Sequence, residues 1–188
     1  MRANLIHEQL VRYLTDAHAI EEQSLGLLRR ARRGCARPDL RELYEHQLLR
    51  AEAHRELLEA RLQAHGAKAS ALKDAAMRLG AFNWGLIFQA QPDTAGKATT
   101  FAFALTHLKI AAYELLKRVA ARAGDEATVA MSEHVLGEER DGASRLSASF
   151  DTAVEASLQA REAPGRPTEQ LLRSLAAGER KAAPLRPI

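Results

Sequence analysis

Residues 97–125, KATTFAFALTHLKIAAYELLKRVAARAGD, show most clearly which kind of fold the chain adopts. Up to Ala123 this stretch contains neither Gly nor Pro, and it is rich in Ala, Leu and Lys, which favour helices. Gly124 is suited to end such a helix, and Asp125 is suited to cap the next one. The sequence therefore predicts two long helices, at 97–123 and 126–156, joined by a short turn.

The N-terminal part of the chain has the same organisation. The segment from Gly34 to Pro38 separates two further long stretches that are rich in Ala, Leu, Arg and Glu. These stretches predict helices at 4–33 and 39–65, with Asp39 as the capping residue of the second helix. No segment alternates between apolar and polar residues with a period of two, so no strand is expected.

The connection between these two helical hairpins decides the topology. It is about thirty residues long and includes an apolar stretch that predicts a shorter helix at 71–90. Two antiparallel hairpins with one long crossover are typical of the ferritin-like variant of the four-helix bundle, whereas an up-down-up-down bundle needs three short loops. We therefore predict an all-α ferritin-like bundle over residues 1–156, followed by a flexible tail with prolines and arginines at 157–188.

The composition excludes several classes of protein. Of the 188 residues, 46% are hydrophobic and 27% are charged, and 27 Lys and Arg against 24 Asp and Glu give a net charge of only +3. This balance does not indicate nucleic acid as a partner, no apolar run is long enough for a membrane span, and no secretory signal is visible. The single cysteine, Cys35, excludes an internal disulfide and a cysteine-based zinc site. We expect a cytoplasmic protein, and a homodimer because the 71–90 stretch is apolar on more than one face.

Each of the four long helices carries a charged residue near the middle of its apolar face. Counting in steps of three and four along the helices places Glu21, Arg50, Lys109 and Glu139 there. Antiparallel packing brings such mid-helix positions to one level. A charge buried alone costs several kcal/mol, so these four residues must pair with one another or bind a ligand.

Ferritin-like bundles hold two metal ions at this level, and they use carboxylates together with Glu-x-x-His pairs. No Glu of this chain is followed three residues later by His. The predicted level contains two anions and two cations, and it is neutral without a metal. The sequence favours pairing of Glu21 and Glu139 with Arg50 and Lys109, and it leaves open a retained metal site that also uses His54.

Four local strings resemble those of the YciE/YciF type of ferritin-like proteins. They are LTDAHAIEEQ at 14–23, EAHRELLEARLQAHG at 52–66, HLKIAAYELL at 107–116 and GEER at 137–140. The resemblance extends over about residues 5–154 in the order expected for that family. It implies a metal-binding ancestor and a stress-related role.

The resemblance also assigns candidate site residues. Its metal ligands, for iron or manganese, fall on Glu21, His54, Glu138 and Glu139. Possible supporting residues are His107 and Tyr113. Arg50 and Lys109 stand where the family commonly has carboxylates, which implies that the di-metal site is degenerate.

The resulting expectation is a structural or residually metal-binding bundle with no catalytic residues and no resident cofactor. Two alternatives stay open at this point. One is a working di-iron or di-manganese oxidase. The other is a DNA-protecting ferritin relative that uses the arginine-rich end of the first helix, where the arginines are Arg29, Arg30, Arg32, Arg33 and Arg37.

Overall fold

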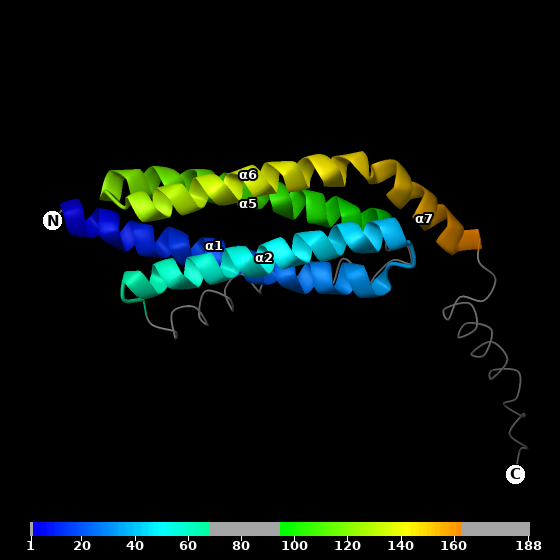
Figure 1. Ribbon diagram of the computed structural model, residues 1–188, viewed down its shortest axis with the longest axis horizontal. Helices are drawn as coiled ribbons and strands as arrows, with labels where there is room; N and C mark the ends of the chain where they lie inside the picture. The colour runs from blue at the N-terminus through cyan, green and yellow to red at the C-terminus, as the bar shows by residue number, and fades with distance from the viewer. Residues whose placement is uncertain (1, 68–94, 163–188) are drawn as a thin grey trace, which may run out of the picture.

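A computed structural model describes residues 2–67 and 95–162, and every regular element in these ranges is a helix (Figure 1). The helices are α1 (Arg2–Gly34), α2 (Pro38–Ala64), α5 (Ala95–Ala123), α6 (Glu126–Ala148) and α7 (Phe150–Glu162). Helices α1 and α2 form one antiparallel hairpin and α5 and α6 form the other, with α1 packed against α5. The predicted all-α ferritin-like bundle is confirmed. The predicted helix at 71–90 lies outside the described residues, as do residues 163–188 of the predicted tail; residues 157–162 of that tail belong to α7.

The two hairpin turns differ in how they start the second helix. At α6, Asp125 is the N-cap and its carboxylate accepts a hydrogen bond from the backbone N–H of Thr128, as predicted. Gly124 has a φ of 72°, which is a conformation that favours glycine. At α2, Asp39 is not the capping residue, because the helix already begins at Pro38, whose missing N–H costs nothing in the first turn. The Asp39 carboxylate instead binds the Arg37 guanidinium at 2.8 Å.

The predicted helix at 126–156 is in fact two helices. Helix α6 ends at Ala148, and Ser149 lies between it and α7. The Ser149 hydroxyl donates to the carbonyl oxygen of Leu146 at 2.8 Å, a local bond that competes with continued helix geometry. The bend lets α7 pack against α5, where the rings of Phe150 and Phe103 are 5.4 Å apart. Helix α7 continues to Glu162, past the predicted end at residue 156.

The apolar core has two parts, one on each side of a central level of polar residues. The first part lies toward the α1–α2 turn and includes Leu25, Leu28, Tyr44 and Leu146. The second lies toward the α5–α6 turn and includes Leu10, Leu14, Leu58 and Leu136. Burial of these side chains on both sides excludes water from the level between them. None of the described helices is both long and apolar enough to cross a membrane.

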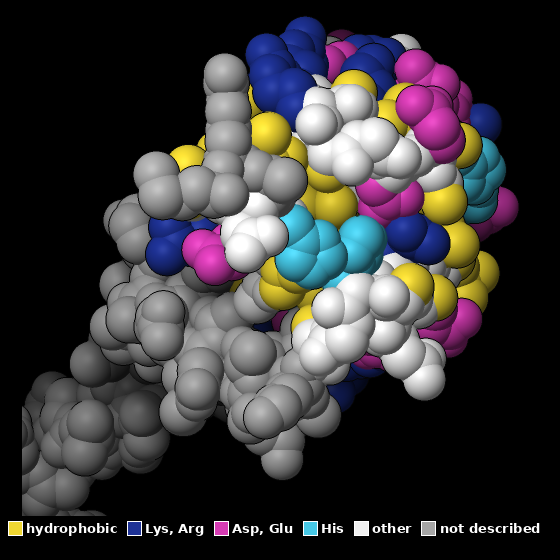
Figure 2. All heavy atoms as spheres, turned by 90° about the vertical axis from the view of Figure 1, so that its left-hand side faces the viewer, with side chains coloured by type: hydrophobic (Ala, Val, Ile, Leu, Met, Phe, Trp, Pro, Cys, Tyr) yellow, Lys and Arg dark blue, Asp and Glu magenta, His cyan; other side chains and the backbone are white. Residues whose placement is uncertain are grey.

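Asp125 also ties α2 to α6 at the end of the bundle that Figure 2 faces. Its carboxylate accepts hydrogen bonds from Arg61 at 2.7 Å and lies 2.8 Å from His65 Nε2. The His65 ring in turn lies 5.2 Å from the His7 ring, and histidine side chains are visible together in this view. Burial opposes ionisation of Asp125, but its bonds to Thr128, Arg61 and His65 outweigh this effect and hold its pKa well below the ordinary value.

Replacing Asp125 with Asn is expected to remove part of the acid sensitivity of the fold. A carboxyl with a depressed pKa in the folded state stabilises the protein above its unfolded pKa of about 3.9, and this contribution is lost as the pH falls below that value. We expect urea unfolding at pH 7, 5 and 3 to show that, between pH 7 and pH 3, the free energy of unfolding falls by about 1–2 kcal/mol more for the wild type than for Asp125→Asn. The Asn side chain can still cap the helix, so the comparison reports the charge. Glu126→Gln, an exposed neighbour in the same first turn, is the matched control. Parallel acid profiles for wild type and Asp125→Asn would contradict the prediction.

Candidate functional site

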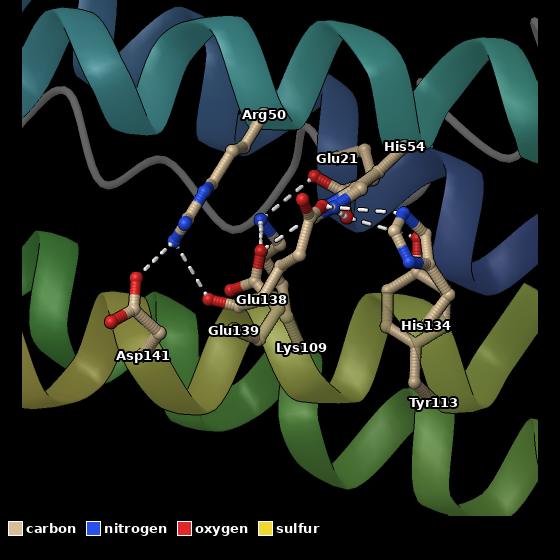
Figure 3. A network of polar contacts seen from close by, with 9 residues as sticks. All are labelled: Glu21, Arg50, His54, Lys109, Tyr113, His134, Glu138, Glu139 and Asp141. Atoms are coloured by element: carbon tan, nitrogen blue, oxygen red, sulfur yellow. Dashed lines mark hydrogen bonds and ion pairs between the residues drawn. The ribbon is translucent and has the colours of Figure 1, made fainter.

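Four titratable side chains from four helices meet at the polar level in the centre of the bundle (Figure 3). They are Glu21 from α1, His54 from α2, Lys109 from α5 and Glu139 from α6, and we call them the charge cluster. Glu21, His54 and Glu139 are fully buried, and Lys109 is 3% exposed. Side chains of this kind are rarely so deeply buried unless each has a partner of opposite charge.

Lys109 bridges the two buried carboxylates. Its Nζ lies 3.0 Å from Glu21 Oε2 and 2.5 Å from Glu139 Oε1. Burial alone would lower the pKa of Lys109, but the charges of Glu21 and Glu139 outweigh burial and raise that pKa above its ordinary value. The reverse holds for Glu139, where burial opposes ionisation but Lys109 and His54 lower the pKa. Lys109 thus lies within reach of both carboxylates.

His54 supplies the second positive charge of the cluster. Its Nδ1 lies 3.2 Å from Glu139 Oε1 and 3.5 Å from Glu21 Oε1, and its Nε2 lies 2.7 Å from Glu138 Oε2. Burial alone would lower the pKa of His54, but the carboxylates of Glu139 and Glu21 raise it to about 9. With His54 protonated, the two buried carboxylates face two cations, so the charge cluster is neutral.

Tyr113 and Glu138 support the cluster from outside. The Tyr113 hydroxyl donates to Glu21 Oε1 at 3.0 Å, and burial followed by the Glu21 charge raises the tyrosine pKa well above its ordinary value. Tyr113 therefore keeps its proton and orients Glu21. Glu138 is partly exposed and links His54 to the surface residue His134, whose Nε2 is 3.8 Å away. His107, the other predicted supporting residue, is instead exposed and packs edge-on against Phe103.

Arg50 does not join the charge cluster, in contrast to the prediction. Its guanidinium lies 2.8 Å from Asp141 Oδ2 and donates to the backbone oxygen of Glu138 at 2.9 Å, and its side chain is 18% exposed. Figure 3 shows it pointing away from Lys109. The buried face of α2 passes through Gln47, Ala51 and His54, which are four and three residues apart. Arg50 therefore lies at the edge of this face.

The charge cluster includes three groups that are common metal ligands. One atom each from Glu21, His54 and Glu139 lies within 4.8 Å of the others. Two divalent ions bring about four positive charges and need several bridging carboxylates. Within residues 2–67 and 95–162, only two carboxylates are fully buried at this level, and Lys109 already lies between them. The residues present therefore do not fit the di-metal centre of a ferritin-like bundle.

A second group of possible ligands lies between α1 and α2, and the sequence analysis missed it. His18, Glu22 and Glu59 each offer an atom within 4.8 Å of the others. The spacing of His18 and Glu22, four residues apart on one helix, was the available signal. Arg55 lies 3.2 Å from Glu22 and 3.4 Å from Glu59, so a cation is already present beside both carboxylates.

Solved structures with the same arrangement of helices include three bacterial proteins. A protein from Xanthomonas campestris has a TM-score of 0.66 at 18% identity, with 85% of this chain and 99% of that chain covered. The Escherichia coli stress protein YciF has a TM-score of 0.61 at 16% identity, with 80% and 97% covered. A two-domain protein from Anabaena variabilis, with DJ-1/ThiJ/PfpI-like and ferritin-like domains, has a TM-score of 0.60 at 19% identity, with 86% of this chain but 40% of that chain covered.

At these identities the solved structures support the fold alone. No curated protein matches the sequence. One family does match it over residues 6–159, which include all four residues of the charge cluster and most of the described helices. The predicted relationship to YciF-type ferritin-like proteins is thereby confirmed, and the chain belongs to the family described as a domain of unknown function, DUF892.

Proposed function

We propose that this protein is a non-catalytic ferritin-like bundle in which the Lys109 ammonium takes the place of the metal ions. The observation that carries the proposal is the position of Nζ, 3.0 Å from Glu21 and 2.5 Å from Glu139. A cation held between the only two fully buried carboxylates at this level of the described helices neutralises them without a metal. In this account the cluster has a structural role, because it joins α1, α5 and α6 through one side chain.

A stress-related role belongs to the proposal as well. It rests on the resemblance of the sequence strings to the YciE/YciF type and on the fold shared with the Escherichia coli stress protein. A cytoplasmic location and a homodimer remain predictions from the sequence. Growth of a deletion strain under oxidative or osmotic stress, with complementation by the wild-type gene, tests the role directly.

A second candidate function is a metal-dependent oxidase, and one observation favours it. Glu21, His54 and Glu139 are all buried and close enough to share an ion. The DNA-protecting alternative finds less support, since several arginines near the α1–α2 turn are already paired. Arg29 binds Glu52 at 3.0 Å, Arg32 binds Glu45, and Arg37 binds Asp39.

Metal analysis separates the first two candidates. We expect protein purified without chelator, and then incubated with Fe(II) or Mn(II) and desalted, to retain well below one metal ion per chain. The reason is that a metal would have to displace a buried, paired ammonium. About two irons per chain would overturn the proposal and favour the oxidase. A salt-dependent shift of a DNA fragment on a gel would instead favour the DNA-protecting alternative.

A further inference from the structure

The arrangement of atoms in the charge cluster is compatible with one metal ion, although two do not fit. Ligand bonds of about 2.0–2.2 Å in a tetrahedral zinc site place neighbouring ligand atoms about 3.3–3.6 Å apart. His54 Nδ1 lies 3.2 Å from Glu139 Oε1 and 3.5 Å from Glu21 Oε1. The histidine nitrogen thus already lies at nearly the separation from each carboxylate oxygen that such a site requires, and one ligand atom from each of the three residues lies within 4.8 Å of the others.

The hydrogen bonding of these atoms agrees with that arrangement. Four buried atoms of the cluster make no well-aligned hydrogen bond within the described part of the chain, namely Glu21 Oε2, His54 Nδ1, Glu139 Oε1 and Glu139 Oε2. Three of them, Glu21 Oε2, His54 Nδ1 and Glu139 Oε1, instead make ion-pair contacts within the cluster. These three atoms are therefore held mainly by their ion pairs.

The groups that orient metal ligands in proteins are also present. His54 Nε2 lies 2.7 Å from Glu138 Oε2, which is the carboxylate–histidine pairing that typically fixes a metal-bound imidazole. Tyr113 holds Glu21 from the other side at 3.0 Å. The obstacle is Lys109, whose ammonium lies between the two carboxylates, where an ion would bind.

We propose that Lys109 is the residue that excludes metal from this bundle, and that its removal leaves a site for one divalent transition-metal ion, held by Glu21, His54 and Glu139. This inference rests on the proposed function, in which the ammonium replaces a metal. Two carboxylates match the charge of one divalent ion, and the space vacated by the lysine side chain holds a water molecule as fourth ligand. A second ion has no further buried carboxylate to bind at this level of the described helices.

The test uses the full chain as wild type and as Lys109→Ala, titrated with Zn(II) by calorimetry and with Co(II) by visible absorption. We expect Lys109→Ala to bind one ion per chain at least 100-fold more tightly than wild type. Its Co(II) complex should show the intense bands of a four-coordinate site. Zn(II) should raise the melting temperature of Lys109→Ala and leave that of the wild type unchanged.

Two control variants show where the metal binds. Lys109→Ala combined with Glu139→Gln should lose the tight binding, whereas Lys117→Ala, which removes a partly exposed lysine from the same helix, should behave as wild type. If Lys109→Ala does not fold without metal, the Lys109→Ser variant takes its place and is refolded in the presence of Zn(II). Recovery of helicity at one ion per chain then supports the proposal.

The outcomes distinguish this inference from the proposed function. Tight binding of two ions by the wild type would overturn the proposed function. The inference alone would be overturned if the wild type binds no metal and the Lys109 variants neither bind one ion nor refold with it. Tight binding that survives the Glu139→Gln change would also overturn it, because the ion would then lie elsewhere.

Discussion

Replacing Lys109 with Met is expected to lower the free energy of unfolding by about 3–5 kcal/mol, because it removes the cation that lies between two buried carboxylates. Glu21 and Glu139 are fully buried, so water cannot replace the lost charge. His54 then remains as the cationic neighbour of both carboxylates within the cluster. Methionine has nearly the length of lysine, and the loss therefore reports the charge more than the packing. Urea unfolding monitored by circular dichroism at pH 7 measures the change.

The control for this variant is Lys117→Met on the same helix. Lys117 Nζ lies 3.8 Å from the exposed carboxylate of Glu133, and exposed ion pairs contribute about 0–1 kcal/mol. Removing Lys117 should therefore cost no more than that. Equal effects of the two substitutions would show that the Lys109 charge does not stabilise the centre of the bundle.

Raising the pH from about 6.5 to about 9 is expected to remove about 3 kcal/mol of stability through His54. The folded pKa of His54 is raised to about 9 from the ordinary value of 6.5. A raised pKa means that protonated His54 stabilises the fold fully below the unfolded pKa, and that this contribution is lost as the pH rises through the folded value. The groups that face His54 are Glu21 from α1, Lys109 and Tyr113 from α5, and Glu138 and Glu139 from α6.

Unfolding measurements at several pH values between 6 and 10 test this expectation when the wild type is compared with His54→Gln. The variant should be less stable at pH 6 and should lack most of the stability loss that the wild type shows between about pH 6.5 and 9, because glutamine has no proton to release. Exposed His134 offers a control, and His134→Gln should keep the slope of the wild type. A wild-type profile as flat as that of His54→Gln would mean that His54 is neutral in the folded protein at pH 7.

The buried faces of the long helices could be predicted from the sequence where apolar residues recur without ambiguity. In α1, the residues that steps of three and four connect to Glu21 are buried from Leu10 to Leu28. In α6, Glu139 lies between Leu136 and Ala143 as the spacing predicts. Such faces are recognisable because steps of three and four keep returning to the same side of a helix.

The register of α2 could not be obtained in the same way. Between Leu43 and Leu58, the sequence is compatible with more than one choice of buried residues at steps of three or four. Whether Arg50 or Ala51 lies on the buried face depends on how α2 packs against α6. The preference of Arg50 for Asp141, and of His54 for three carboxylates on two other helices, is a property of tertiary contacts. The break at Ser149 also depends on tertiary contacts. A single serine in a helical stretch rarely ends a helix, and here α7 packs against α5 after the break.

A crystal structure of the wild-type protein grown with Mn(II) or Fe(II) tests the central claim most directly. With data collected at the metal absorption edge, an anomalous difference map locates any bound ion. We predict no anomalous peak between Glu21 and Glu139, with the Lys109 ammonium in contact with both carboxylates. A peak at that position, with the Lys109 side chain turned away, would contradict the claim that the ammonium takes the place of the metal.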